Sequence, residues 1–154
     1  VWLENSSGYH VKTLFEPEIE NALPYWQWKV AEYEKAKREA ESNEAEGVDA
    51  MSSATPNASF DPRDYILPER NTEPFFMVVE VDEAGDANDD YSDQPSILYR
   101  VEIDNAYPSY FQVLEIVGYT RYDVDADSWD AYFPDGRLST ALGLIDSALL
   151  TIER

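Results

Sequence analysis

The pattern of apolar and polar positions predicts a series of short β-strands. Residues 75–81, FFMVVEV, form a near-continuous apolar run, which is typical of a strand at a central position in a sheet. Residues 96–103 carry apolar side chains at every second position, which predicts a half-buried strand. Residues 110–121 predict one further strand with bulky side chains on both faces, and residues 147–153 predict the last strand.

The first third of the chain predicts a hairpin followed by a helix. Residues 1–4 and 9–15 are β-prone runs joined by the turn-forming sequence NSSG, so we expect a β-hairpin. The pattern then changes to a three- and four-residue spacing of Trp26, Val30 and Tyr33 in a stretch rich in Ala, Glu and Lys. This spacing predicts a helix over residues 24–42, with Pro24 in its first turn.

The prolines that follow the predicted helix predict a segment without regular secondary structure. Residues 43–74 contain Pro56, Pro62, Pro68 and Pro74, so no long regular element fits there and we expect an extended surface segment. Residues 138–145 predict a short helix or an extended loop. Six or so strands with one inserted helix indicate a single, mainly β domain over residues 1–154, built from two packed antiparallel sheets.

Composition narrows the function classes. The 154 residues include 32 Asp and Glu against 11 Lys and Arg, a net charge of −21. Phosphate recognition needs clustered basic residues, so the charge argues strongly against nucleic acid as a partner and disfavours anionic membrane surfaces. A hydrophobic fraction of 44% argues against a disordered chain, and the absence of cysteine excludes disulfides and thiol chemistry.

Targeting signals are sparse in this sequence. No apolar run approaches the ~20 residues that span a bilayer, so we expect no membrane span in this chain. No signal peptide is visible, and the abrupt start of the sequence in a β-prone run is compatible with the removal of a leader.

One short segment points to specific chemistry. The sequence Asp49-Ala50-Met51-Ser52-Ser53-Ala54-Thr55 resembles the Asp-x-x-Ser-Gly-Ala-Thr motif. Extracytoplasmic flavin transferases attach FMN to the threonine of that motif through a phosphodiester bond. The resemblance implies Thr55 as the acceptor and Asp49 and Ser52 as its motif partners. The acceptor hydroxyl must be exposed on a loop that a second enzyme can grasp, and small flanking side chains suit this need.

The segment departs from the motif at one position, and it has an alternative interpretation. Ser53 stands where the motif has glycine, and a positive φ there would cost a serine roughly 1 kcal/mol. The alternative interpretation is an unmodified loop rich in Ser and Ala.

Other pieces of the chain support the same resemblance, namely residues 1–4 with Gly8, 11–15, 22–26, 79–81, 94–99 and 142–146. Together they are similar to the predicted periplasmic domain-of-unknown-function family 2271, which accompanies flavin-transferase systems. The resemblance implies a periplasmic location and an immunoglobulin-like sandwich similar to the domain of flagellar hook-capping proteins, with no established activity. It further implies an accessory of extracytoplasmic flavin-dependent electron transfer, partnered by a flavin transferase or a membrane redox protein.

An acidic segment offers a second candidate site. Asp123, Asp125, Asp127 and Asp130 alternate with other residues, and several carboxylates from one loop can share a calcium ion, which prefers 6–8 oxygen ligands. The segment lacks the glycine and terminal glutamate of an EF-hand loop. The alternative is a solvated acidic loop.

The sequence offers few candidate catalytic residues. His10 is the only histidine and is expected at a surface or an edge, and no nucleophile motif or phosphate-binding glycine loop is present, so we do not expect an enzyme. The rival functions are a ligand-binding or adhesion module, for carbohydrate or calcium, and a structural envelope domain. Aromatic side chains could stack on a flavin or a sugar, or could serve as core and rim of the sandwich: Trp26, Trp28, Tyr107, Tyr110, Tyr119, Tyr122, Trp129 and Tyr132.

Overall fold

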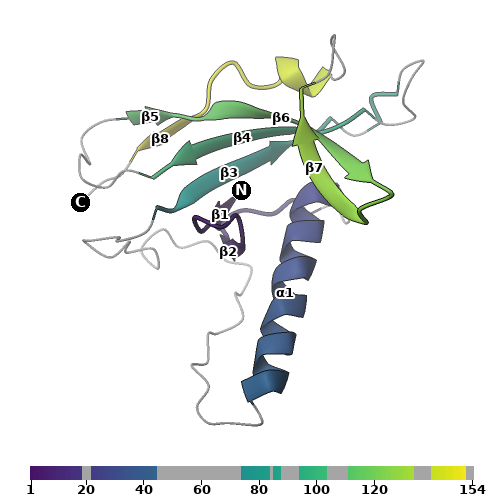
Figure 1. Ribbon diagram of the computed structural model, residues 1–154. Coiled ribbons are helices and arrows are strands. Elements are labelled where there is room, and N and C mark those ends of the chain that lie inside the picture. Colours follow the sequence, from purple (N-terminus) through teal and green to yellow (C-terminus); the bar gives the residue numbers. More distant parts are fainter. Residues whose placement is uncertain are drawn as a thin grey trace.

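The computed structural model describes residues 1–18, 22–44, 74–83, 85–87, 94–103, 111–133 and 140–151. This part of the chain is mainly β with one long helix, as the sequence predicts (Figure 1). The elements, in chain order, are β1 (Trp2–Glu4), β2 (His10–Thr13), α1 (Pro24–Glu44), β3 (Phe76–Val81), β4 (Ile97–Glu102), β5 (Phe111–Val113), β6 (Glu115–Asp123), β7 (Ser128–Tyr132), a 3₁₀ helix (Thr140–Gly143) and β8 (Leu149–Thr151).

Six strands form one curled antiparallel sheet. Their order is β2-β1-β3-β4-β6-β7, and each neighbouring pair is antiparallel. The predicted hairpin is confirmed as β1 and β2, and the apolar run over 75–81 becomes β3, inside the sheet as expected. β-branched and aromatic residues dominate these strands because they pack well on a pleated, buried surface.

The two faces of this sheet carry different cores. One face, which we call the helix-side face, buries Trp2, Val78 and Leu98 against Tyr25 and Trp26 of α1. The other face, the ladder-side face, buries a cluster of apolar side chains that also includes Ala141 of the 3₁₀ helix: Ile97, Tyr99, Leu114 and Tyr119. Because successive side chains of a strand point to opposite faces, β3 and β4 contribute to both cores.

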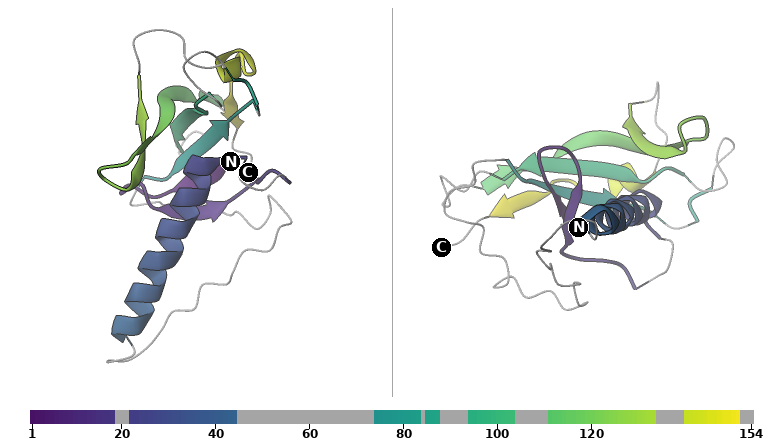
Figure 2. Two further views of the ribbon diagram at one scale, coloured as in Figure 1. Left: turned by 90° about the vertical axis from the view of Figure 1, so that its right-hand side faces the viewer. Right: turned by 60° about the horizontal axis from the view of Figure 1, so that its bottom comes forward.

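A second, two-stranded ladder covers the ladder-side face. β5 pairs antiparallel with β8, and Leu150 packs against the ladder-side core together with Ile145 and Ala148. The arrangement is therefore layered, with the ladder on one face of the large sheet and α1 on the other (Figure 2). An immunoglobulin-like connectivity stays a prediction, because residues 104–110 and 134–139 lie outside the described part.

Two sequence predictions need correction. Residues 110–121 were expected to form one strand, but the chain divides at Leu114, so that β5 joins the ladder and β6 joins the large sheet. The buried Leu114 marks the crossing between the two layers. The acidic loop expected around residues 123–130 is instead a β-hairpin, since β7 begins at Ser128 and pairs with β6.

Helix α1 confirms the predicted helix and extends it to Glu44. Its first turns pack on the sheet, whereas the second half runs away from it into solvent (Figures 1 and 2). Most side chains from Ala31 to Glu39 are exposed, and only Tyr33 and Lys37 in that stretch are half-buried. A helix with so little buried surface gains stability mainly where it is attached.

Candidate functional site

The predicted acceptor motif lies outside the described residues. Asp49, Ser52, Ser53 and Thr55 all fall in residues 45–73, as does most of the segment 43–74 predicted to be extended. The last described residue before that segment is the end of α1. Glu44 ends α1 away from the sheet (Figure 1), and Asp49 follows five residues later (49 − 44 = 5).

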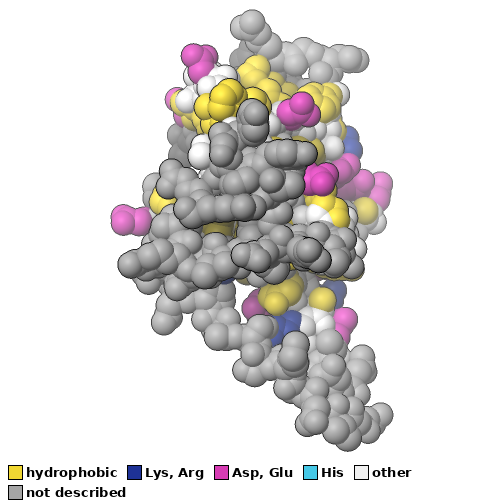
Figure 3. Space-filling model, turned by 90° about the vertical axis from the view of Figure 1, so that its left-hand side faces the viewer, with side chains coloured by type: hydrophobic (Ala, Val, Ile, Leu, Met, Phe, Trp, Pro, Cys, Tyr) yellow, Lys and Arg dark blue, Asp and Glu magenta, His cyan; other side chains and the backbone are white. Residues whose placement is uncertain are grey.

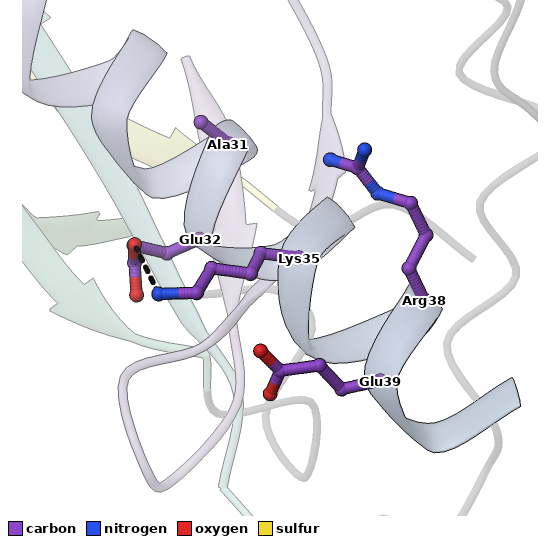
Figure 4. Close-up of a pocket in the computed structure, with 5 residues that line it drawn as sticks. All are labelled: Ala31, Glu32, Lys35, Arg38 and Glu39. Atoms are coloured by element: carbon purple, nitrogen blue, oxygen red, sulfur yellow. Dashed lines mark ion pairs between the residues drawn. The ribbon is translucent and has the colours of Figure 1, made fainter. Parts of the chain in front are cut away.

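A shallow hollow lies along the exposed flank of α1. Figure 4 shows its lining, five side chains that all come from this helix. Glu32 Oε1 and Lys35 Nζ are 3.9 Å apart, and both side chains are exposed. An ion pair of this kind between exposed residues at i and i+3 is worth only a few tenths of a kcal/mol. The hollow therefore offers flexible charged groups and no enclosed ligand site. The lining residues are Ala31, Glu32, Lys35, Arg38 and Glu39.

The acidic residues predicted to bind calcium lie around the β6–β7 hairpin. The carboxylate of Asp123 accepts hydrogen bonds from the backbone N–H groups of Asp125 (2.9 Å) and Ala126 (3.1 Å), which stabilises the turn. Asp127 takes a left-handed conformation with φ 50° and accepts a hydrogen bond from the hydroxyl of Tyr122. Aspartate tolerates this conformation better than most residues.

The four carboxylates do not converge in this structure. Asp130 lies on β7, 3.8 Å from Arg121 Nη2, and its other oxygen accepts a hydrogen bond from the N–H of Ala131. Nowhere in the described residues do three or more His, Asp or Glu side chains gather as a metal site would require. Calcium at this hairpin stays a prediction, and it would require Asp123 and Asp127 to exchange their present hydrogen bonds for metal contacts.

The same hairpin carries an aromatic pair. Tyr122 and Trp129 are directly paired across β6 and β7, with ring centroids 5.7 Å apart and planes tilted by 53°. Tyr122 is exposed and Trp129 half-buried. By contrast, Tyr119 is part of the ladder-side core, and Trp26 of α1 packs against the helix-side core, while Tyr107 and Tyr110 lie outside the described residues. Of the predicted stacking residues in the described chain, this pair is the best placed to meet a flat ligand.

A buried polar group lies where α1 joins the sheet. Glu80 of β3 is only 5% exposed, and its carboxylate accepts hydrogen bonds from the backbone N–H groups of Trp26 (2.8 Å) and Tyr25 (3.3 Å). These are N–H groups of the first helical turn, which a side chain just before the helix usually caps. Leu23 holds that position and has no polar side chain. Glu80 therefore supplies the missing cap from a distant strand.

Two hydroxyl groups complete the surroundings of Glu80. Ser96 Oγ lies 2.6 Å from Glu80 Oε1, and Thr120 Oγ1 lies 2.8 Å from Ser96 Oγ. Burial raises the pKa of Glu80 to about 7, against the opposing effect of the hydrogen bonds from Ser96, Trp26 and Tyr25. The buried carboxyl group is thus balanced between its two protonation states near neutral pH.

A second buried carboxylate pins the same end of the helix. Glu4 Oε1 accepts a hydrogen bond from Trp2 Nε1 at 3.0 Å and lies 3.4 Å from Lys29 Nζ. Lys29 also donates to the carbonyl of Gly8 at 2.7 Å and lies over the rings of Tyr25 and Trp28. The ammonium group is therefore enclosed by polar and aromatic partners, as a half-buried charge requires.

His10 is more deeply buried than the sequence predicts. It lies on the edge strand β2, as expected, but it is only 5% exposed and packs against Tyr33 of α1. Its Nε2 is 2.8 Å from Thr13 Oγ1, which also accepts a hydrogen bond from Trp26 Nε1. Burial lowers the pKa of His10 to about 4, so the neutral ring is the form held beneath α1.

The residues under α1 were missed by sequence reasoning. One signal could have found Glu80, because a lone glutamate inside the apolar run of a doubly buried strand needs a partner. The partner, a helix N-terminus 54 residues away in sequence, has no signature of its own.

An exposed apolar surface lies on the outer side of the ladder. Phe111, Val113 and Leu149 point away from the core, and Phe111 is 67% exposed. Figure 3 views the molecule from the side of β5 and β8, and hydrophobic side chains gather in the upper part of that face. Exposed clusters of apolar side chains occur at contact surfaces.

Comparisons with models of known protein families, with curated proteins and with solved structures found no match to this chain. The resemblance of its short sequence pieces to the periplasmic family stays a prediction. Among the described residues, no helix has both the length and the apolar composition needed to cross a membrane.

Proposed function

We propose that this chain is a non-enzymatic accessory domain of extracytoplasmic flavin-dependent electron transfer and that it carries FMN on Thr55. In this transfer the threonine oxygen forms a bond to the FMN phosphorus of a flavin dinucleotide, the phosphoanhydride bond of the dinucleotide breaks, and a nucleoside monophosphate leaves while the threonine proton is lost. The chain thereby gains the mass of FMN minus water. A flavin transferase performs the attachment, and a membrane redox protein is the expected electron partner. The redox chemistry belongs to the flavin, and the protein supplies the tether.

The observation that carries this proposal is that the motif follows α1 directly in the sequence. The segment Asp49 to Thr55 begins just beyond a helix whose last residue, Glu44, lies away from the sheet (Figure 1). A modifying enzyme needs access to the acceptor without competition from a packed core, and a projecting helix supplies such an approach. The layered β core at the other end of the helix supplies a rigid base.

Replacement of Thr55 tests the proposal directly. The wild-type chain, produced together with an extracytoplasmic flavin transferase, should gain the mass of FMN minus water and absorb in the visible range. Thr55→Ala should remove both signals because the acceptor oxygen is gone. Thr72→Ala, which changes a threonine outside the motif in the same proline-rich segment, should keep both. Intact-protein mass spectrometry measures the extent of attachment.

Ser53 allows a second, graded variant. Ser53→Gly restores the glycine of the motif, so the attached fraction should rise if that position takes a positive φ. The proposal fails if neither wild type nor Ser53→Gly gains flavin from a transferase that modifies a substrate with the glycine-containing motif.

The β6–β7 hairpin favours a second candidate function, a ligand-binding or adhesion module. It places an aromatic pair, the exposed Tyr122 and the half-buried Trp129, beside the acidic turn. If the turn binds calcium, millimolar Ca²⁺ should raise the melting temperature more than Mg²⁺ at equal ionic strength, because ligand binding stabilises the folded state. Asp125→Asn should reduce that selective rise, whereas Glu39→Gln, on exposed α1, should not. Equal shifts with both ions would count against calcium, and if FMN attachment also failed, a structural envelope domain would remain.

A further inference from the structure

One ionisable group with several partners lies at the attachment of α1 to the sheet. The carboxyl group of Glu80 bonds the N–H groups of Tyr25 and Trp26 and lies beneath the first turn of the helix. Beyond Tyr33 the described helix side chains are mostly exposed. The buried end of the helix, with Glu80 and the Glu4–Lys29 pair, therefore fixes where the projecting half points.

The pocket around Glu80 accommodates both protonation states. An ionised carboxylate accepts a hydrogen bond from Ser96, and Ser96 in turn accepts one from Thr120. A neutral carboxyl group can donate its proton to Ser96, which then donates to Thr120, since either hydroxyl of that pair can be the donor. Ser96 and Thr120 are each 3% exposed, so water does not replace them. Neither state leaves a buried polar atom of this trio without a partner.

The charged and titratable groups that face Glu80 do not neutralise it. No lysine or arginine of the described residues forms an ion pair with Glu80. Asp82, at the end of the same strand, adds repulsion, and the hydroxyl of Tyr25 faces it from α1 with a pKa that burial raises above its usual value. The amino group of Val1 attracts it from beside β1, but burial lowers the pKa of that amine to about 6. Above pH 7 the ionised carboxylate therefore lacks a strong counter-charge.

We propose that Glu80 makes the docking of α1 dependent on pH: docking buries this carboxyl group without a counter-charge, which costs little while the group is neutral and opposes docking once it is ionised. In a released helix the side chain of Glu80 is in water and takes its ordinary pKa of 4.5. The docked state binds the proton more tightly, so the docking equilibrium weakens as the pH rises from 4.5 to about 7. Between pH 5 and 8 the loss is on the order of 100-fold.

His10 acts on the same helix in the opposite sense and must be separated from Glu80. It packs on Tyr33 from β2, and the charges of Glu34 and Lys29 act on its pKa in opposite directions. A ring whose pKa is lowered by burial favours release of α1 as the pH falls below 6.5. His10→Gln keeps a partner for Thr13 and removes this titration.

Native-state hydrogen exchange of the full chain tests the proposal. In His10→Gln, the protection of the α1 amides, corrected for the intrinsic effect of pH, should fall on the order of 100-fold from pH 5 to pH 8. In His10→Gln/Glu80→Gln it should stay within a few-fold, because glutamine mimics the neutral carboxyl group at every pH. Amides of β4 should exchange more slowly than those of α1 throughout, as a local opening requires.

Two outcomes of the exchange experiment and one outcome of an NMR titration would overturn the proposal. Protection of α1 could be equally pH-dependent with and without Glu80, or α1 and β4 could exchange with one common free energy, which would make the opening global. A ¹³C NMR titration of Glu80 in the wild-type chain needs no variant that might misfold. A midpoint near 7 supports the proposal, and a midpoint at or below 4.5 rejects it.

Discussion

At the scale of single residues, the notable feature is that ionisable side chains are buried without full charge compensation. Glu80 and His10 are each only 5% exposed, and burial shifts their pKa values in opposite directions, to about 7 and to about 4. The reason is the same for both, because a low-dielectric interior disfavours the charged form of any group. Each group therefore makes the folding equilibrium depend on pH, and the two dependences have opposite directions.

The pH dependence of global stability should reveal both signs. Glu80 contributes stability below pH 4.5 that is lost as the pH rises through about 7, whereas His10 contributes stability above pH 6.5 that is lost as the pH falls through about 4. Each effect amounts to about 3 kcal/mol in the free energy of unfolding, so the two oppose each other between pH 4.5 and 6.5.

Urea denaturation from pH 4 to 8.5 separates them. Relative to wild type, Glu80→Gln should gain stability as the pH rises above 5, and His10→Gln should gain as it falls below 6. Parallel curves for wild type and both variants would show that neither group titrates differently in the folded chain.

At the scale of elements, the β6–β7 hairpin shows how closely two strands can approach. Gly118 of β6 has φ +149°, and a Cβ atom built on it would lie 2.7 Å from the carbonyl oxygen and 2.9 Å from the nitrogen of Tyr132. The neighbouring atoms are backbone and cannot rotate away. The hairpin therefore needs glycine at this position, both for its φ and for its space.

Gly118→Ala should destabilise the domain by about 2–4 kcal/mol, because strain and overpacking add at one backbone position. Gly143 is the matched control: nothing lies within 4 Å of its built Cβ atom and its φ is unremarkable. Gly143→Ala should change the free energy of unfolding by less than about 0.5 kcal/mol. Similar losses for the two variants, measured by urea denaturation, would contradict this reading of the hairpin.

At the scale of the whole molecule, the chain combines a two-sided sheet with a strongly acidic surface. The large sheet needs cover on both faces, and it receives α1 on one and the β5–β8 ladder on the other. The net charge of −21 keeps such molecules apart at low salt and argues for partners with basic rims around any apolar contact. The same charge makes self-association through the apolar ladder surface unfavourable when salt is low.

The sequence predicted the helix and the strands better than it predicted the surroundings of the candidate functional residues. The helix over 24–42 followed from local spacing and composition, and β3 followed from its apolar run. The break at Leu114 was missed because both halves of residues 110–121 are equally β-prone, and only the competition between two sheets divides them. The predicted acceptor residues lie outside the described chain. The predicted calcium ligands lie in the β6–β7 hairpin, where the carboxylates of Asp123, Asp127 and Asp130 have partners of their own, and calcium there stays a prediction.

The sequence by itself determined what local physics can decide: a mainly β chain, one helix beginning at Pro24, an acidic surface without cysteine, and a flavin-attachment-like motif. Tertiary structure decided what depends on residues far apart in the chain. Glu80 became the cap of α1, and His10 became a buried group, because burial and hydrogen-bond partners are set by packing across 54 and 23 residues (33 − 10 = 23). Such long-range environments leave no periodic trace in the sequence, since they arise only when the sheet and the helix meet.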